Sequence, residues 1–266
     1  MLERFKAFLH RPDHLTAQAR KLSKELPEFK EDWKINFGGI TISGQSATGK
    51  TYLAEVIATI YRIPEARNIK IGQIIRKLMG KEDAIDFIER GPDIDSQVDR
   101  LSQDLVEKAS LESPFLLEAR RGGEIANKYR DSQKPPVITV LLTVDEENRN
   151  KRLKGKRPEL SVDEINANES NRAKKDLERW RSIDLNFIGD PYDPKHFDLK
   201  IDTSNKSQEE VFRELHGFLL DRDLVESKNP DLEGKQPSPR EPDNEEGSFP
   251  RSGTVFDTNP QPPAAA

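Results

Sequence analysis

The chain contains no cysteine, which excludes disulfides, thiolate zinc sites and cysteine nucleophiles. It is also poor in apolar residues, because 33% of its 266 positions are hydrophobic, 7% are aromatic and 34% are charged. No apolar run approaches the roughly 18 residues of a membrane-spanning helix, and the first residues lack the apolar core of a signal peptide. We therefore expect a cytoplasmic protein that does not associate with membranes, and part of which does not pack into a core.

The charge distribution lacks the basic surface that a nucleic-acid-binding protein needs. The net charge is −5, and residues 221–266 hold ten acidic and five basic side chains. The remaining 220 residues carry 38 charges of each sign, which gives a neutral body and an acidic tail. We therefore expect no nucleic-acid partner.

Composition divides the chain into three parts. Residues 1–36 are predicted to form an N-terminal helical extension, in which Leu15, Ala19, Leu22 and Leu26 recur at helical spacing. Residues 225–266 are predicted to be a disordered, proline-rich acidic tail, because residues 227–266 hold 8 of the 18 prolines and almost no periodic apolar residues. Residues 37–224 remain as the predicted nucleotide-binding domain.

One stretch fits the pattern Gly-x-x-x-x-Gly-Lys-[Ser/Thr], the loop that wraps a nucleotide's phosphates: Gly44, Gln45, Ser46, Ala47, Thr48, Gly49, Lys50 and Thr51. A β-branched apolar run (39–43) precedes it and a helical apolar pattern (51–60) follows, the context that distinguishes this motif from a plain glycine-rich turn. Lys50 is expected to reach the β- and γ-phosphates of ATP, and the Thr51 hydroxyl to ligate Mg²⁺. The loop therefore predicts a nucleoside triphosphate site.

Strand-like and helix-like segments alternate along the rest of the domain. Further strands are predicted at 68–72, 114–118, 137–144 and 197–202. Ser161 and Ser207 each stand three residues before a glutamate, the capping-box signature of a helix start. We therefore predict an α/β fold, a three-layer P-loop NTPase sandwich around a parallel five-stranded sheet.

The class of P-loop protein is suggested by what accompanies the loop. No Asn-Lys-x-Asp motif of GTPases is present, and the strand ending at Glu118 lacks the consecutive acids usual in helicases and AAA-type machines. A small-molecule kinase must instead neutralise two phosphate-bearing substrates, which requires arginines from several segments. Such arginines follow predicted strand ends or lie on predicted lid helices: Arg76, Arg120, Arg149, Arg152, Arg157, Arg172 and Arg179.

With these features in place, the chain resembles the cytidylate kinases, in particular the compact archaeal-type members of the nucleoside-monophosphate kinases, over about residues 40–219. The resemblance is carried by residues 71–76, 92–100, 117–120 and 146–152, and most specifically by Arg172-x-x-x-Asp176-x-x-Arg179. Three departures lie on the acceptor side: Gln73 replaces an aspartate, Ala119 replaces a glycine, and Leu101-Ser102 stand where Arg-Gln is common.

The resemblance implies transfer of phosphate from ATP to CMP or dCMP with Mg²⁺, and a fold with a helical acceptor-binding insert and a lid. Lys50, Arg149 and Arg152 would be catalytic, and Thr51 and Glu118 would hold the metal. The acceptor would be bound by seven residues: Arg76, Asp99, Arg100, Arg120, Arg172, Asp176 and Arg179.

Other interpretations stay open for the site residues and for the whole chain. The arginines and Asp99 also fit solvated helix faces, and Trp180 and Phe187 are expected to pack rather than to stack on a base. Two other functions fit the motifs: a P-loop kinase of another small acceptor, and a non-catalytic nucleotide-binding protein that acts through partners. A small-molecule kinase of this type is expected to be a monomer or a weak dimer.

Overall fold

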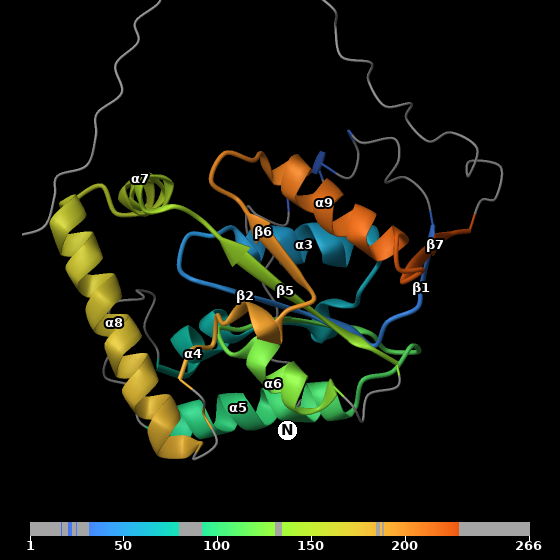
Figure 1. The fold of residues 1–266 in the computed structure, drawn as a ribbon, viewed down its shortest axis with the longest axis horizontal. Helices are drawn as coiled ribbons and strands as arrows, with labels where there is room; N and C mark the ends of the chain where they lie inside the picture. The colour runs from blue at the N-terminus through green and yellow to red at the C-terminus, as the bar shows by residue number, and fades with distance from the viewer. Residues whose placement is uncertain are drawn as a thin grey trace, which may run out of the picture.

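Strand β2 (Gly39–Gly44), which leads into the glycine-rich loop, lies at the centre of a five-stranded parallel sheet (Figure 1). The computed structural model describes residues 17, 21–22, 25, 32–79, 92–130, 135–184, 187 and 189–228. The strand order is β3-β4-β2-β5-β6, and every neighbouring pair is parallel. The other strands are β3 (Asn68–Lys70), β4 (Phe115–Glu118), β5 (Val137–Thr143) and β6 (Leu199–Asp202). The predicted parallel sheet is confirmed.

Helices cover both faces of this sheet, as Figure 1 shows. Helices α3 (Lys50–Ile60) and α9 (Gln208–Leu220) pack on one face, where Ile40 and Ile42 of β2 join one apolar cluster. Helices α4 (Ile71–Met79), α5 (Pro92–Glu107) and α6 (Gly122–Lys128) contribute to a second cluster with residues of β4. Because successive residues of a strand face opposite sides, β2 serves both layers and the predicted three-layer sandwich is confirmed.

Two further helices form the edge of the molecule beside the carboxyl ends of the strands. These are α7 (Glu146–Lys156) and the 22-residue α8 (Val162–Ile183), which runs from α7 to the N-terminal end of α5 in Figure 1. Both predicted capping boxes are present, because Ser161 and Ser207 accept hydrogen bonds from the backbone amides of Glu164 and Glu210. Short 3-10 turns, η2 (Glu65–Arg67) and η5 (Pro194–His196), precede β3 and β6.

A small antiparallel sheet places the limits of the folded unit slightly outside residues 37–224. Strand β1 (Trp33–Ile35) pairs with β7 (Val225–Ser227), so residues assigned to the two flanking segments belong to the fold. A strand of three residues is too short to show the alternation of apolar and polar residues by which strands are predicted from a sequence. Of the predicted N-terminal extension before residue 32, four positions are described, all helical, and Leu22 packs against the first apolar cluster. The predicted tail beyond residue 228 lies outside the described residues.

Within the described part of the chain, none of the helices combines the length and the apolar character that crossing a membrane requires.

Candidate functional site

The glycine-rich loop joins the carboxyl end of β2 to the first turn of α3. Gly44 and Gly49 adopt positive φ angles of 143° and 92°, a conformation that glycine adopts without strain. A Cβ atom on Gly44 would also lie 2.4 Å from the carbonyl oxygen of Leu142, so this position has no room for a side chain. The amides at the start of α3 are left without intrahelical partners there, which makes the loop an anion-binding cradle.

One cavity of about 590 Å³ opens beside this loop, a volume usual for small-molecule sites. Its lining residues come from the loop, from α4, α5, α7 and α8, and from the end of β4. The predicted site residues in this lining are Ala47, Thr48, Gly49, Lys50, Thr51, Arg76, Asp99, Glu118, Arg120, Arg152, Arg172 and Asp176. Segments far apart in the sequence therefore converge on one space, as the carboxyl ends of parallel strands in open α/β sheets commonly do.

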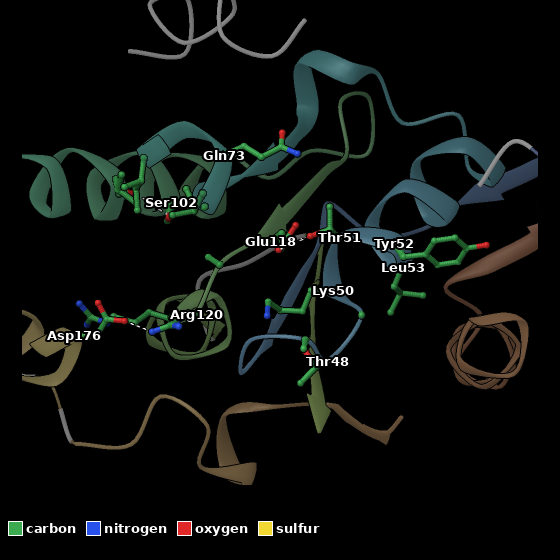
Figure 2. Close-up of a pocket in the computed structure, with 18 of the residues that line it drawn as sticks. Thr48, Lys50, Thr51, Tyr52, Leu53, Gln73, Ser102, Glu118, Arg120 and Asp176 are labelled. Atoms are coloured by element: carbon green, nitrogen blue, oxygen red, sulfur yellow. Dashed lines mark hydrogen bonds and ion pairs between the residues drawn. The ribbon is translucent and has the colours of Figure 1, made fainter. Parts of the chain in front are cut away.

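Lys50 projects into the middle of this cavity (Figure 2). Its Nζ donates a hydrogen bond of 2.6 Å to the backbone oxygen of Gln45, which holds the ammonium over the loop. Desolvation lowers the pKa of Lys50 to about 8, and the carboxylate of Glu118 opposes this shift. Because desolvation disfavours the charged ammonium of Lys50, an anion that enters the cavity would stabilise it.

Thr51 and Glu118 lie together next to Lys50, and both carry oxygen atoms of the kind that Mg²⁺ prefers. The Thr51 hydroxyl donates to Oε1 of Glu118 over 3.0 Å, the contact drawn in Figure 2. Mg²⁺ at phosphate sites is held by one or two protein oxygens together with the phosphates and water. Among the described residues, no group of three or more His, Cys, Asp or Glu side chains is arranged to hold a metal alone. The pair thus fits a nucleotide-dependent metal.

The two arginines of α7 that were predicted to belong to a lid both contact the glycine-rich loop. Arg149 donates from Nη1 to the side-chain oxygen of Gln45 over 3.1 Å. Arg152 donates to the backbone oxygen of Ala47 over 3.2 Å and to the hydroxyl of Thr203 over 3.0 Å. Both guanidinium groups therefore lie beside the loop from which a triphosphate would be held, although only Arg152 lines the cavity in this structure.

A buried cluster of charges forms where α8 faces the end of β4. Asp176 is 1% exposed and forms ion pairs with Arg120 and with Arg179, and Figure 2 shows the first contact. Arg179 also lies 2.9 Å from Oδ2 of Asp95 on α5. Asp176 and Arg179 therefore belong to an inward-facing network rather than to a solvated helix face. Arg172, one turn earlier, lines the cavity 3.9 Å from Glu169.

Two predicted acceptor-binding residues do not reach the cavity. Arg100 is exposed and absent from the lining, because α5 turns Asp95, Val98, Asp99 and Ser102 inward and Arg100 lies off that stripe. Arg179 is also absent from the lining, since its guanidinium is occupied by Asp176 and Asp95 behind the wall. Direct contact with a ligand is therefore not supported for Arg100, and Arg179 is placed to orient Asp176.

Two residues of the site were not predicted as such from the sequence. Arg121 is 3% exposed, lines the cavity and contacts carboxylates of three separate segments. Ser102 lines the cavity on the inward stripe of α5. Neighbouring charges along a chain do not reveal a buried arginine, and the only available signal was a second arginine directly after Arg120. Trp180 also lines the cavity, packed on Phe187 with ring centroids 5.7 Å apart.

Several known proteins are similar to this chain. The cytidylate kinase of Methanopyrus kandleri is 30% identical over 181 residues, which cover 65% of this chain and 88% of that protein. The cytidylate kinase of Pyrobaculum islandicum is 31% identical over 180 residues, with the same shares covered. No protein-family model matches the chain.

Solved structures of kinases also match, at lower similarity. A shikimate kinase from Bacteroides thetaiotaomicron gives a TM-score of 0.45 at 15% identity, covering 70% of this chain and 98% of that one. A thymidylate kinase from Candida albicans gives a TM-score of 0.39 at 15% identity, covering 73% and 96%.

Proposed function

Because this chain belongs to the cytidylate kinase family of nucleoside-monophosphate kinases, we propose that it transfers the γ-phosphoryl group of ATP to CMP or dCMP. One observation carries this proposal beyond the family similarity. A single cavity holds the phosphate-binding loop with Lys50 and also the Arg120–Asp176 pair. Two phosphate-bearing substrates thus have room and counter-charges in the same space.

The donor would lie on the glycine-rich loop. Lys50 would neutralise the β- and γ-phosphates. Arg149 and Arg152 would stabilise the negative charge that develops on the transferred phosphoryl group. All three groups already contact the loop through Gln45 or Ala47, so little rearrangement is required. The bond from the γ-phosphorus to the leaving oxygen of ADP breaks while a bond to a phosphate oxygen of CMP forms.

Mg²⁺ is expected to be held by Thr51 and Glu118 together with the phosphates of ATP. When bound, the ion would neutralise charge on the β- and γ-oxygens. The hydroxyl of Thr51 donates its proton to Glu118, so its lone pairs remain available for a cation. We expect the activity to disappear on chelation of divalent metal and to return when Mg²⁺ is added.

The acceptor would be bound between β4, α5 and α8. Arg76, Arg120 and Arg172 line this side of the cavity and suit a phosphate dianion. Asp99 on α5 also lines this side of the cavity, and its carboxylate could bind the base of the acceptor. Because a phosphate oxygen of CMP is already anionic at neutral pH, no general base is required, and positioning with charge neutralisation supplies the catalysis.

Release of ADP, measured in a coupled assay with CMP, dCMP, UMP, AMP and GMP as acceptors, tests the proposal directly. We expect kcat/KM to be highest for CMP or dCMP. A preference for another small phosphate or hydroxyl acceptor would identify the chain as a different P-loop kinase. Binding of ATP without turnover of any monophosphate would indicate a non-catalytic nucleotide-binding protein, and either result overturns the proposed activity.

A further inference from the structure

A single buried hydroxyl joins the strand of the glycine-rich loop to the turn that follows β4. Ser43, the residue before Gly44, is fully buried and does not line the cavity. Its Oγ donates to the backbone oxygen of Ala119 over 2.9 Å and accepts from the backbone amide of Gly123 over 3.1 Å. The hydroxyl therefore uses its donor and an acceptor site on backbone groups 76 and 80 residues farther along the chain.

The two backbone groups that this hydroxyl contacts lie on either side of a tight turn. The amide of Gly122 donates to the oxygen of Ala119 over 3.4 Å, which closes the turn. Its two central residues, Arg120 and Arg121, both line the cavity. Because the closing bond is long, the bond of 2.9 Å from Ser43 is the better of the two that the carbonyl of Ala119 accepts. Ser43 therefore holds the beginning of the turn and the start of α6 together.

The glycines at the start of α6 allow this close approach to β2. A Cβ atom on Gly122 would lie 3.4 Å from Oγ of Ser43, and one on Gly123 would lie 2.2 Å from the ring of Phe197. Side chains alternate along a strand, so Ser43 faces α6, whereas Ile42 faces the apolar cluster that includes α3. Loss of the hydroxyl is thus expected to act on the turn and not on the helix that follows the glycine-rich loop.

Arg120 is the residue of the turn that the proposed acceptor site uses. Its guanidinium reaches from the turn to Asp176 on α8, a contact drawn in Figure 2, and donates to the hydroxyl of Ser46 over 3.4 Å. The position of this group therefore depends on where the backbone of the turn lies. Misplacement by about 1 Å of a group that positions a substrate can cost on the order of 100-fold in rate.

We infer that Ser43 is a positioning residue for the acceptor: by holding both ends of the turn, its hydroxyl directs the guanidinium of Arg120 into the cavity. The inference rests on the proposed function, in which Arg120 binds the phosphate of the acceptor, and adds a residue that touches neither substrate. Without the hydroxyl, a buried carbonyl and a buried amide lose a partner, which is costly unless the turn shifts to find other partners. Arg120 would shift with the turn.

A purely structural role for Ser43 makes a different prediction. If the hydroxyl only stabilises the fold, its loss lowers the fraction of folded protein, which lowers kcat and leaves every KM unchanged. If it positions Arg120, its loss raises the KM for CMP in the folded protein and leaves binding of a non-hydrolysable ATP analogue intact. The effect would then be transmitted through Arg120, so it should disappear in a protein that lacks this arginine.

The experiment combines steady-state kinetics with CMP and calorimetric binding of the ATP analogue, at a temperature at which the proteins are folded. We expect Ser43→Ala to raise the KM for CMP at least ~10-fold and to change the Kd of the analogue less than ~2-fold. Arg120→Gln should also raise this KM, and adding Ser43→Ala to it should raise the KM less than ~2-fold further. Thr41→Val is the matched control. The Thr41 hydroxyl lies on the same face of β2, is fully buried and has no hydrogen-bond partner among the described residues.

The wild type tests the proposed function, and the variants test the inference. A wild type that phosphorylates no monophosphate overturns the function and, with it, the acceptor role of Arg120. If the wild type is active, three results overturn the role of Ser43: an unchanged KM for CMP in folded Ser43→Ala, an equal rise in Thr41→Val, or a full further rise in the double variant. If Ser43→Ala does not fold, Ser43→Cys decides, because a thiol is only a weak donor and acceptor. A raised KM for CMP with unchanged binding of the analogue then supports the inference, and any other result contradicts it.

Discussion

At the scale of single residues, Lys50 shows how a binding group destabilises the fold that carries it. Its pKa of about 8 lies below the 10.5 of a free lysine because the cavity desolvates the ammonium. Between these two values the unfolded state binds more protons than the native state, so stability rises with pH across that window. Below pH 8 the full penalty applies, and an anionic ligand would relieve it.

We therefore expect Lys50→Met to abolish kinase activity while stabilising the ligand-free protein at pH 7 by on the order of 1–2 kcal/mol, after allowance for partial exposure and the lost hydrogen bond to Gln45. Denaturant unfolding from pH 7 to 10 measures both effects, because the variant should lack the gain of stability that the wild type shows above pH 8. Lys174→Met on the exposed face of α8 serves as control. If the stability of the wild type and of Lys50→Met changes with pH in the same way, desolvation of Lys50 is not the cause of the pH dependence.

Asp176 presents the opposite case, because its charge supports the fold and the site together. The carboxylate is buried and paired with Arg120 and Arg179, so its removal leaves two guanidiniums without their shared counter-charge. Spacing alone suggests a small effect on stability for this position, whereas burial predicts a loss of about 3–5 kcal/mol in the free energy of unfolding.

For Asp176→Ala we expect this destabilisation together with a fall of at least ~30-fold in kcat/KM for CMP, roughly 2 kcal/mol. The KM for ATP should hardly change, because the glycine-rich loop is intact. Steady-state kinetics below the melting temperature and chemical denaturation provide the two measurements. Glu178→Gln, exposed on the same helix, should alter neither quantity. Normal CMP kinetics in a folded Asp176→Ala protein would show that this charge cluster does not contribute to binding of the acceptor.

At the scale of secondary-structure elements, the two short strands β1 and β7 define where the domain ends. Val225 is 2% exposed, and Glu226 bonds to Lys34 and Asn36 across the pair. Truncation after residue 228 should leave the melting temperature within about 2 °C of the full chain and the activity unchanged, because the removed segment is polar and proline-rich.

The matched truncation after residue 224 differs by four residues and removes β7. We expect it to cost about 2–4 kcal/mol, which corresponds to a fall of roughly 5–12 °C in a domain of this size. Calorimetry on both truncated proteins makes the comparison. Equal melting temperatures would show that the β1–β7 pair contributes nothing, and a large fall after residue 228 would show that the tail packs on the domain.

The elements that the sequence predicted best are those with strong local signals. The glycine-rich loop, the apolar strand β5 and the two capping boxes are determined by neighbouring residues, and the structure confirms them. Strands of three residues and the inward stripe of α5 depend on partners distant in the sequence. Arg100 and Arg121 illustrate this limit, because one was expected in the site and is exposed, while the other was not expected and is buried.

At the scale of the whole molecule, α8 connects the proposed donor side of the cavity to the proposed acceptor side. Near its start, Asn166 accepts from Arg149 over 3.4 Å, and Arg149 contacts the glycine-rich loop. Ten residues later, Asp176 pairs with Arg120 at the end of β4. A rigid helix of 22 residues spans about 33 Å, so displacement at one end is transmitted to the other.

We therefore expect the two substrates to bind cooperatively. A non-hydrolysable ATP analogue should tighten CMP binding by about 5–150-fold, the usual range of coupling between sites, and CMP should tighten binding of the analogue by the same factor. Isothermal titration of each ligand with and without the other measures both factors. Asn166→Ala, which removes the contact of α8 with Arg149, should weaken the coupling while leaving the affinity for CMP alone unchanged. Independent binding in the wild type would mean that α8 only encloses the cavity, and that the lid and the acceptor insert close separately.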